Sequence, residues 1–382
     1  MRPKLSVILP VYQGHNVLPL SLAALAGSDL PRADWELIVV DDASTDDTVL
    51  IAAPYADTIV RLSGKPRGPA YARNRGFEVC RGDIVVFVDA DVCVHEDTLS
   101  KFVGVFAENP DAVAAFGSYD AQPTSKGVVS QFRNLMHHYV HNTNPGDAET
   151  FWAGCGAVRA AGFADVGMFN EWHYSRPQIE DIELGRRLRA QGHRILLRPE
   201  IQCTHLKRWT LSGMLTTDLQ HRGVPWMWLL LQEGPSAGSK ALNLKTSEKV
   251  CAGLVGSAAL ALLAAAALGS VWLLGFAIAA LFVVLWKNRR FYGYLSRQRG
   301  AFFALVAMGL HLLFYLVSVV SAVSGWLMYS LFGEPAPTVE AAAQAQLGIK
   351  TWPPGPVRLP GSVWDANPDL VSKRSTSRST TV

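Results

Sequence analysis

Charged residues are scarce in this sequence: only 18% of its 382 residues are Asp, Glu, Lys or Arg, whereas soluble domains carry about 25%. The shortage is concentrated in two stretches, because residues 250–286 and 301–332 contain no Asp, Glu, Lys or Arg at all. Apolar runs of this length are typical of membrane-spanning helices and not of core helices. A fully soluble protein is therefore excluded.

Cysteine is also scarce. The five cysteines lie far apart and form no C-x-x-C pair, which argues against a structural zinc site or a disulfide-stapled secreted domain and for a reducing compartment. A net charge of +3 with no stripe of basic and aromatic residues indicates no nucleic-acid partner. The first apolar stretch is short, is interrupted at Pro10 and lacks a cleavage site, so it predicts a strand and not a signal peptide. The part before Lys249 is expected to stay in the cytoplasm.

The first 210 residues alternate two kinds of pattern. Runs rich in Val, Ile and Leu predict buried strands at residues 5–12, 35–42, 57–62 and 83–91. Helical patterns lie between them at residues 15–26, 44–53 and 68–80, and Ser44 with Asp47 resembles a capping box at the start of the second. This alternation predicts an α/β domain with a mostly parallel, Rossmann-like sheet covered on both faces.

The remaining residues predict a membrane region. Residues 250–286 would form a helix about 55 Å long, against a hydrocarbon core of about 30 Å, so two spans are expected near 250–268 and 270–286. A third is expected near 303–329. Five positive charges and no acid at 287–300 mark that segment as cytoplasmic. We therefore expect a multi-pass protein of the plasma (inner) membrane with a cytoplasmic catalytic domain and a disordered tail at 333–382.

Residues 211–249 differ from both halves. Trp226, Trp228 and a leucine cluster stand beside basic residues, a mixture that suits a helix in the headgroup region followed by a polar linker. An ordinary core helix is the alternative.

Acidic residues follow two of the predicted strands, at Asp41–Asp42 and at Asp89–Asp91. Ligands of open α/β sheets sit at the carboxyl ends of strands. The Asp-x-Asp at 89–91 could aim two carboxylates at one Mg²⁺ or Mn²⁺ that bridges a diphosphate, although aspartates are common in surface turns. Glu180 and Asp181 form a third acidic cluster, in the first turn of a further predicted helix, where they either favour the helix dipole or supply a general base.

Five ordered blocks, SVILPVY, IVVDDASTDDT, GPAYARNRGFEVCRGDIVVFVDADV, FWAGCGAVRAAGF and IEDIELGRRLRAQGHRI, resemble those of family 2 glycosyltransferases with the GT-A fold. The resemblance covers residues 4 to about 210. It implies a GT-A domain at 1–210, and the composition of the remaining chain predicts an interfacial segment and linker at 211–249, a transmembrane region at 250–332 and the tail at 333–382.

The resemblance also implies roles on the donor side. Pro10 and Tyr12 correspond to nucleotide-pocket positions, and Asp42 to the aspartate that binds the base, usually uracil. Arg73 corresponds to a residue near the nucleotide phosphates; as an alternative, it pairs with Asp89 or Asp42.

For the metal and the acceptor side, Asp89 and Asp91 match the carboxylates that hold the metal and the sugar nucleotide. Asp181 matches the catalytic base, and Glu180 supports the acceptor side. His205 resembles an additional metal ligand of some members or is structural. Cys155 stands where the acceptor loop usually has an asparagine, which leaves that contact open.

Together these features predict an inverting, Mg²⁺- or Mn²⁺-dependent transfer of a sugar from a nucleotide-sugar, with a UDP-sugar favoured, to a lipid or polyprenyl-phosphate acceptor in the membrane. Arg222 is expected near an anionic headgroup and Trp226 against the acyl or prenyl chain, unless this segment is only an anchor. A processive polysaccharide synthase is one alternative. A non-catalytic membrane subunit that binds sugar nucleotides is another, which the presence of all four key aspartates disfavours.

Overall fold

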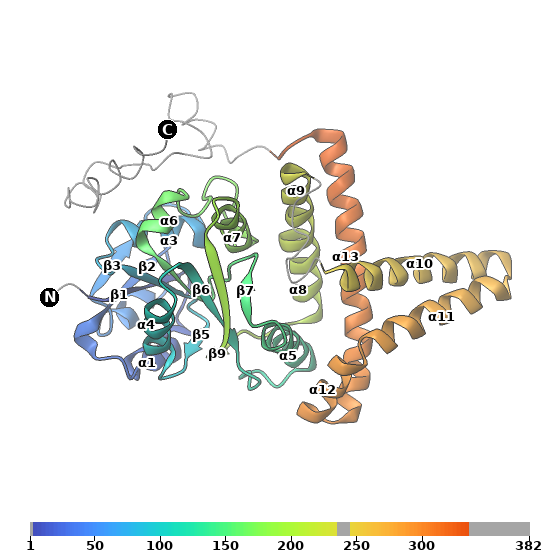
Figure 1. Ribbon diagram of the computed structural model, residues 1–382, viewed down its shortest axis with the longest axis horizontal. Helices are drawn as coiled ribbons and strands as arrows, with labels where there is room; N and C mark the ends of the chain where they lie inside the picture. The colour runs from blue at the N-terminus through green and yellow to red at the C-terminus, as the bar shows by residue number, and fades with distance from the viewer. Residues whose placement is uncertain (1–2, 235–244, 336–382) are drawn as a thin grey trace, which may run out of the picture. The chain divides into compact units, whose positions relative to one another are not determined.

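The computed structural model describes residues 3–234 and 245–335 (Figure 1). Within them the chain forms two compact units. The first comprises residues 3–116 and 151–196, and the second comprises residues 117–150, 197–234 and 245–335. Most of the predicted linker and nearly all of the predicted tail lie outside the described residues.

The first unit contains a mixed sheet. Its strands are β1 (Leu5–Val11), β2 (Trp35–Asp41), β3 (Thr58–Arg61), β4 (Ile84–Val88), β5 (Val92–Val94) and β8 (Cys155–Arg159), while β6 (Ala112–Tyr119) and β9 (Arg194–His205) continue into the second unit. The order is β3-β2-β1-β4-β8-β6. The pairs β2–β3, β1–β2 and β1–β4 are parallel, and β8 runs antiparallel to both β4 and β6. Every residue of β1 and β2 is buried, so the predicted sheet covered on both faces is confirmed.

In the described part of this unit, seven helical segments accompany these strands: α1 (Leu18–Ala26), η1 (Arg32–Asp34), α2 (Thr48–Ala52), α3 (Pro69–Glu78), α4 (Thr98–Glu108), α6 (Ala160–Asp165) and α7 (Glu180–Ala190). The capping box predicted at Ser44 is wrong, because α2 begins only at Thr48. The Ser44 hydroxyl instead accepts the backbone N–H of Gln13 at 2.9 Å. That contact fixes the loop after β1 and leaves Ser44 outside the helix.

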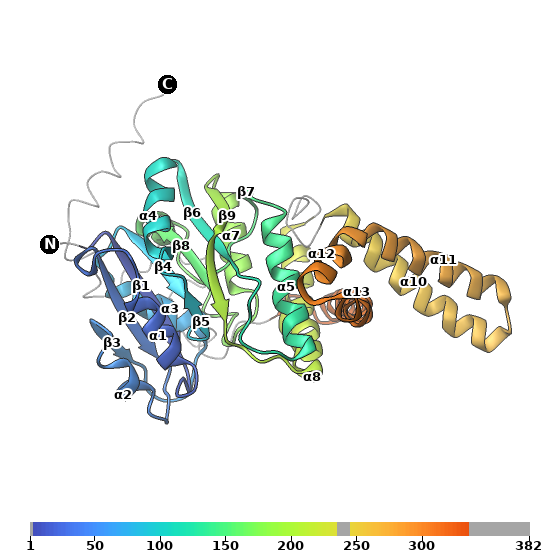
Figure 2. The same cartoon turned by 90° about the horizontal axis from the view of Figure 1, so that it is seen from below.

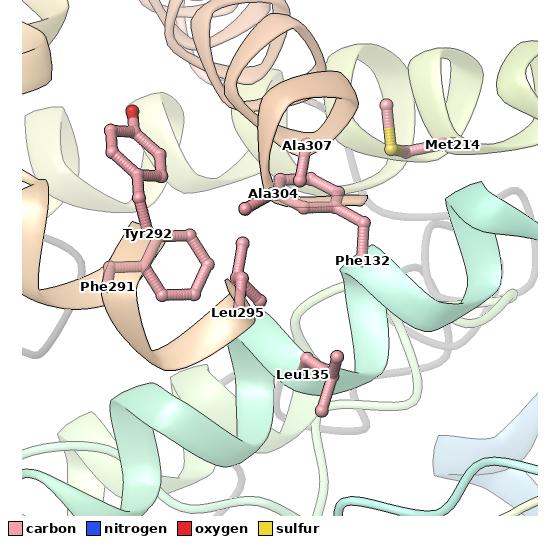
Figure 3. Close-up of a cluster of buried hydrophobic side chains, with 8 residues drawn as sticks. All are labelled: Phe132, Leu135, Met214, Phe291, Tyr292, Leu295, Ala304 and Ala307. Carbon is pink, nitrogen blue, oxygen red and sulfur yellow. The ribbon is translucent and has the colours of Figure 1, made fainter. Parts of the chain in front are cut away.

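Among the described residues, the second unit is helical apart from the C-terminal parts of β6 and β9 and the short strand β7 (Gly146–Ala148), which pairs with β9. Its helices are α5 (Val128–Asn142), α8 (Leu211–Thr216), the π-helix η2 (Thr217–Gly223), α9 (Val224–Glu233), α10 (Thr246–Leu268), α11 (Val271–Lys287), α12 (Arg289–Arg299) and α13 (Ala301–Phe332). Figure 3 shows a buried cluster to which α5, α8, α12 and α13 all contribute; it consists of Phe132, Leu135, Met214, Phe291, Tyr292, Leu295, Ala304 and Ala307. This packing explains why residues 117–150, which the sequence places inside the catalytic domain, belong to the second unit.

Long apolar helices lie in the second unit. By length and composition α10 and α13 are each able to cross a membrane, and α11 with α12 forms a pair bent by 63° that would count as a third span if taken as one. α10 and α11 are joined by a tight turn at Gly269, which adopts φ 61°, a conformation that glycine tolerates without strain.

Candidate active site

Three residues predicted from the sequence, Tyr12, Asp42 and Asp89, directly follow the parallel strands β1, β2 and β4. Val11 is in register with Asp41, and Ile8 with Phe87, so the chain leaves all three strands at the same edge. This is where open α/β sheets bind their ligands. Pro10 is buried within β1, whereas Tyr12, just beyond it, is 51% exposed.

Asp42 is buried and held by backbone amides. Its carboxylate accepts the N–H of Gly68 at 2.7 Å and the N–H of Arg67 at 3.0 Å to each oxygen. Burial raises the pKa of Asp42, and these two hydrogen bonds oppose that rise. An ionised carboxylate has about four acceptor sites, so Asp42 retains capacity for a ligand N–H.

Gly68 makes this arrangement possible. It adopts φ +89°, and a Cβ atom built there would lie 2.6 Å from the carbonyl carbon of Ser175. Pro69 follows as the first residue of α3, a position where proline is favoured because its fixed φ suits a helix start. Sequence reasoning did not assign Arg67 and Gly68 to the Asp42 site; the Gly-Pro pair before a helix was the available signal.

Arg73 on α3 links two of the predicted acids. Its guanidinium donates to Asp89 at 2.6 Å and to Glu180 at 3.1 Å, and its side chain is only 3% exposed. The structure therefore shows the pairing with Asp89 that the sequence left as an alternative. The charges of Asp89, Glu180 and Asp181 together raise the pKa of Arg73, against the effect of burial, so the group stays cationic.

Asp89 and Asp91 flank the short connection between β4 and β5. Both are partly exposed, and the backbone of Asp89 is fixed because its N–H donates to the carbonyl of Gly154 at 3.2 Å. Burial raises the pKa of Asp89, the Arg73 charge opposes the rise, and Asp91 adds to it. A nearby positive charge would favour the ionised form of both carboxylates.

The described residues contain no cluster of three or more His, Cys, Asp or Glu side chains arranged to hold a metal ion. A two-carboxylate set nevertheless fits Mg²⁺ or Mn²⁺, because such ions are commonly bound through one or two carboxylates together with substrate phosphates and water. The donor set of Asp89 and Asp91 is therefore compatible with the predicted metal.

Asp181 lies in the first turn of α7, next to Glu180. It accepts the N–H of Ala153 at 3.2 Å and that of Ile182 at 2.8 Å. Burial and the charge of Glu180 raise the pKa of Asp181 to about 7, although Arg73 and the two amides act in the opposite direction. A carboxylate with a pKa near neutrality is suited to general-base catalysis.

A polar latch, which the sequence analysis missed, holds the loop before α7 against α3. The side-chain amide of Asn74 donates to the carbonyl of Phe169 at 2.9 Å and to Glu171 at 2.6 Å, and the N–H of Phe169 donates back to Asn74 at 3.0 Å. Phe169 also lies under the Arg73 guanidinium at 5.2 Å. The latch thus supports the residue that organises the acids.

Three other predicted site residues are in the second unit, and Cys155 is in the core of the first. His205 is in the second unit, where its ring stacks on Tyr119 at 4.2 Å. Arg222 is exposed on η2, and Trp226 is half-buried on α9. Cys155 is fully buried in β8 opposite Val88, so its thiol is part of the core.

Comparison with known proteins gives a consistent picture. Residues 6–167 match the sequence profile of the family described as glycosyl transferase family 2. The poly(ribitol-phosphate) beta-N-acetylglucosaminyltransferase TarS of Staphylococcus aureus is 35% identical over 110 residues, which cover 28% of this chain and 19% of that protein. The undecaprenyl-phosphate 4-deoxy-4-formamido-L-arabinose transferase of Yersinia enterocolitica is 27% identical over 150 residues, which cover 38% of this chain and 46% of that protein. The matches span less than half of each of these relatives.

Among solved structures, the mannosyltransferase PcManGT from Pyrobaculum calidifontis in complex with GDP-Man and Mn²⁺ has a TM-score of 0.57 and 22% identity, covering 82% of this chain and 88% of that chain. This likeness shows the shared fold, and the predicted GT-A fold is confirmed.

Proposed function

We propose that the protein transfers a sugar from a nucleotide-sugar, with a UDP-sugar favoured, to a lipid acceptor in the membrane; the match of residues 6–167 to the profile described as glycosyl transferase family 2 supports this. The observation that carries the proposal is the set of acids around Arg73 at the strand ends, with one carboxylate, Asp181, poised to take a proton near neutral pH.

The donor is held at the edge of the sheet. Asp42 has acceptor capacity beyond its bonds to Arg67 and Gly68, and it accepts an N–H of the base. Tyr12 is exposed beside it and covers the face of the base. Both contacts are made to the base of the nucleotide, and the diphosphate lies near Asp89 and Asp91, which follow β4.

Asp89 and Asp91 are the residues that would hold Mg²⁺ or Mn²⁺. When bound, such an ion neutralises the charge that develops on the leaving diphosphate. Arg73 positions Asp89 by holding one of its oxygens at 2.6 Å. Because the same guanidinium binds Glu180 at 3.1 Å, it also fixes the start of α7 and therefore Asp181.

Asp181 acts as the general base. It removes the proton from the attacking acceptor hydroxyl as that oxygen approaches the anomeric carbon opposite the leaving diphosphate, which inverts the configuration. General-base assistance of this kind contributes about 10²–10⁴-fold. A phosphate nucleophile already carries negative charge and needs no base, so a tuned Asp181 favours a lipid that attacks through a hydroxyl group.

A polyprenyl phosphate is the second candidate acceptor. It is favoured by the similarity to the Yersinia enterocolitica transferase, whose name specifies undecaprenyl phosphate. The two candidates respond differently to the Asp181→Asn substitution: transfer to a hydroxyl loses the base, whereas transfer to a phosphate keeps most of its rate.

Arg222 and Trp226 are proposed to meet the acceptor. Both occur at the junction of the π-helix η2 with α9, and π-helical turns are frequent at functional sites. The Arg222 guanidinium is exposed and can donate two parallel hydrogen bonds to a phosphate-containing headgroup.

The test is to incubate the purified full-length protein with a panel of sugar nucleotides, Mn²⁺ and a membrane lipid extract, and to follow labelled sugar into the lipid phase. We expect one nucleotide-sugar to support transfer. Asp181→Asn should lose transfer to a hydroxyl acceptor while donor binding persists, and Asp111→Asn, at an exposed surface carboxylate, should behave as wild type. Equal loss in both variants, or no transfer with any donor, would count against the proposal.

A further inference from the structure

Helix α13 buries one face along its whole length. Its buried residues are Ala304, Ala307, His311, Tyr315, Ser321 and Gly325, which recur at helical spacing on one side. The opposite side is apolar and is exposed toward both ends of the helix, where it carries Phe302, Leu305, Val320, Val323, Leu327 and Leu331; residues 310–319 between them are buried or half-buried. Exposed apolar surface at both ends of the helix requires an apolar environment.

The buried face of α13 packs against elements that carry charge. Near its start lies α12, whose Arg299 donates to the side chain of Gln131 at 2.6 Å. Further along, the hydroxyl of Ser321 donates to the backbone carbonyl of Asp218, whose carboxylate forms a buried ion pair with Arg133 at 2.9 Å.

The last third of α13 follows α9 equally closely. A Cβ atom at Gly325 would lie 2.8 Å from Met227, and the indole N–H of Trp228 donates to the Gly325 carbonyl at 3.1 Å. Beyond the helix end, the side-chain amide of Gln232 donates to Glu334 at 2.7 Å. Polar groups therefore accompany α13 at both ends and between them.

The middle of α13 meets the base of the α10–α11 hairpin. The hydroxyl of Tyr315 donates to Glu248 at 2.7 Å and to Asn288 at 3.4 Å. Glu248 is in the first turn of α10 beside Lys249, and Asn288 stands between Lys287 and Arg289. Charged residues that flank apolar helices lie at the level of the lipid headgroups, so the base of the hairpin is expected there.

A spanning orientation of α13 conflicts with these contacts. If α13 crossed the bilayer symmetrically, its middle, and with it the charged base of the hairpin, would lie about 15 Å inside the hydrocarbon, where charges are expensive. If it were shifted until Tyr315 reached the surface, one half of the helix would stand in water, with either Phe302 and Leu305 or Leu327 and Leu331 exposed there.

We infer that α13 lies in the plane of the membrane, with its exposed apolar face in the acyl-chain boundary, and that only the α10–α11 hairpin crosses the bilayer. Figures 1 and 2 show α13 running crosswise to that hairpin. From Cys251 to Leu268, α10 measures about 27 Å, close to the hydrocarbon thickness. The far part of the hairpin packs through small residues, Ala258, Ala261, Ala277 and Ala280, as membrane helix pairs do. This topology replaces the span expected at 303–329 and is independent of the proposed activity.

Cysteine labelling tests the sidedness. Ser296→Cys on α12, Ser270→Cys at the hairpin tip and Glu334→Cys after α13 are each introduced into the full chain, with the unmodified chain as the background control. They are labelled with an impermeant thiol reagent in right-side-out and in inverted vesicles. We expect positions 296 and 334 to label from one side and position 270 from the other. Labelling of position 334 from the same side as position 270 means that α13 crosses, and the inference is then wrong.

Spin-label depth gives a second readout. Labels at Phe302→Cys, Val320→Cys and Leu331→Cys, all on the exposed face, should report the same shallow depth in liposomes, about 5–10 Å below the surface. Leu260→Cys, exposed at the middle of the segment from Cys251 to Leu268, serves as the deep reference. If position 320 is instead as deep as position 260 while positions 302 and 331 are shallow, α13 is a span.

Discussion

Replacing Arg73 by methionine should destabilise the first unit strongly. Methionine keeps much of the apolar stem but removes the charge that holds Asp89 and Glu180. Breaking a buried ion pair from one side costs about 3–5 kcal/mol, because the remaining charge stays unpaired. Here the Glu180 side chain is 6% exposed and cannot rehydrate, whereas the Asp89 side chain, at 35% exposed, can do so in part.

We therefore place the cost near the lower limit, at about 3 kcal/mol. For a domain of this size that corresponds to a decrease in melting temperature of about 6–12 °C. The measurement is thermal unfolding of the purified full-length protein in detergent. Arg194→Met serves as the matched control, because Arg194 pairs with Asp111 on the surface and exposed pairs contribute about 0–1 kcal/mol.

Adding Glu180→Gln to Arg73→Met should recover part of the loss, because the amide carries no charge to leave unpaired. Coupling energies between contacting residues are about 0.5–3 kcal/mol. A melting temperature of Arg73→Met within about 2 °C of the Arg194→Met value, with no recovery in the double variant, would refute the view that Arg73 balances the buried acids.

Three further predictions concern ligand binding. Asp91→Ala should abolish Mn²⁺-dependent nucleotide binding, measured by calorimetry, while the melting temperature stays close to wild type; unchanged binding would remove Asp91 from the site. Gly68→Ala should lower the free energy of unfolding by about 2 kcal/mol or more, because its methyl group clashes with Ser175, and it should weaken nucleotide binding. Gly64 adopts the same φ of +89° with open space around it, so Gly64→Ala should show only the effect of backbone strain. Equal destabilisation by the two substitutions would contradict the clash. Arg222→Ala with Trp226→Ala should raise the apparent KM for the lipid acceptor and leave donor affinity intact; weaker membrane attachment with unchanged acceptor kinetics would make the segment an anchor.

The acidic residues at the carboxyl ends of the strands were predictable, because each follows its own strand directly in the sequence. Continuous apolar strands followed by Asp42 and Asp89 indicate parallel strands whose ends meet, and the register of β1 with β2 and β4 bears this out. The second partner of Arg73, Glu180, was not predictable in the same way. Glu180 lies 107 residues further along the chain, and only the folded packing of α7 against α3 brings the two together.

Two other features depend on context that no short pattern contains. The pKa of Asp181 rises to about 7 because of burial beside Glu180, while the residue types alone equally suit a helix-dipole role. The orientation of α13 is similar, since length and hydropathy make it a candidate span whether it crosses the bilayer or lies in it. The contact of Tyr315 with Glu248 distinguishes the in-plane orientation of α13 from a spanning one.

The central claim is that Asp181 removes the acceptor proton, and the pH dependence of transfer tests it most directly. With donor saturating, kcat/KM for a hydroxyl acceptor should rise with pH and level off above about 7, because only the ionised carboxylate accepts a proton. Asp181→Asn should remove this acidic limb and lower the plateau by about 10²-fold or more, with donor affinity unchanged. A limb near pH 7 that survives in Asp181→Asn, or a variant that loses donor affinity while bound donor still turns over normally, would contradict the account.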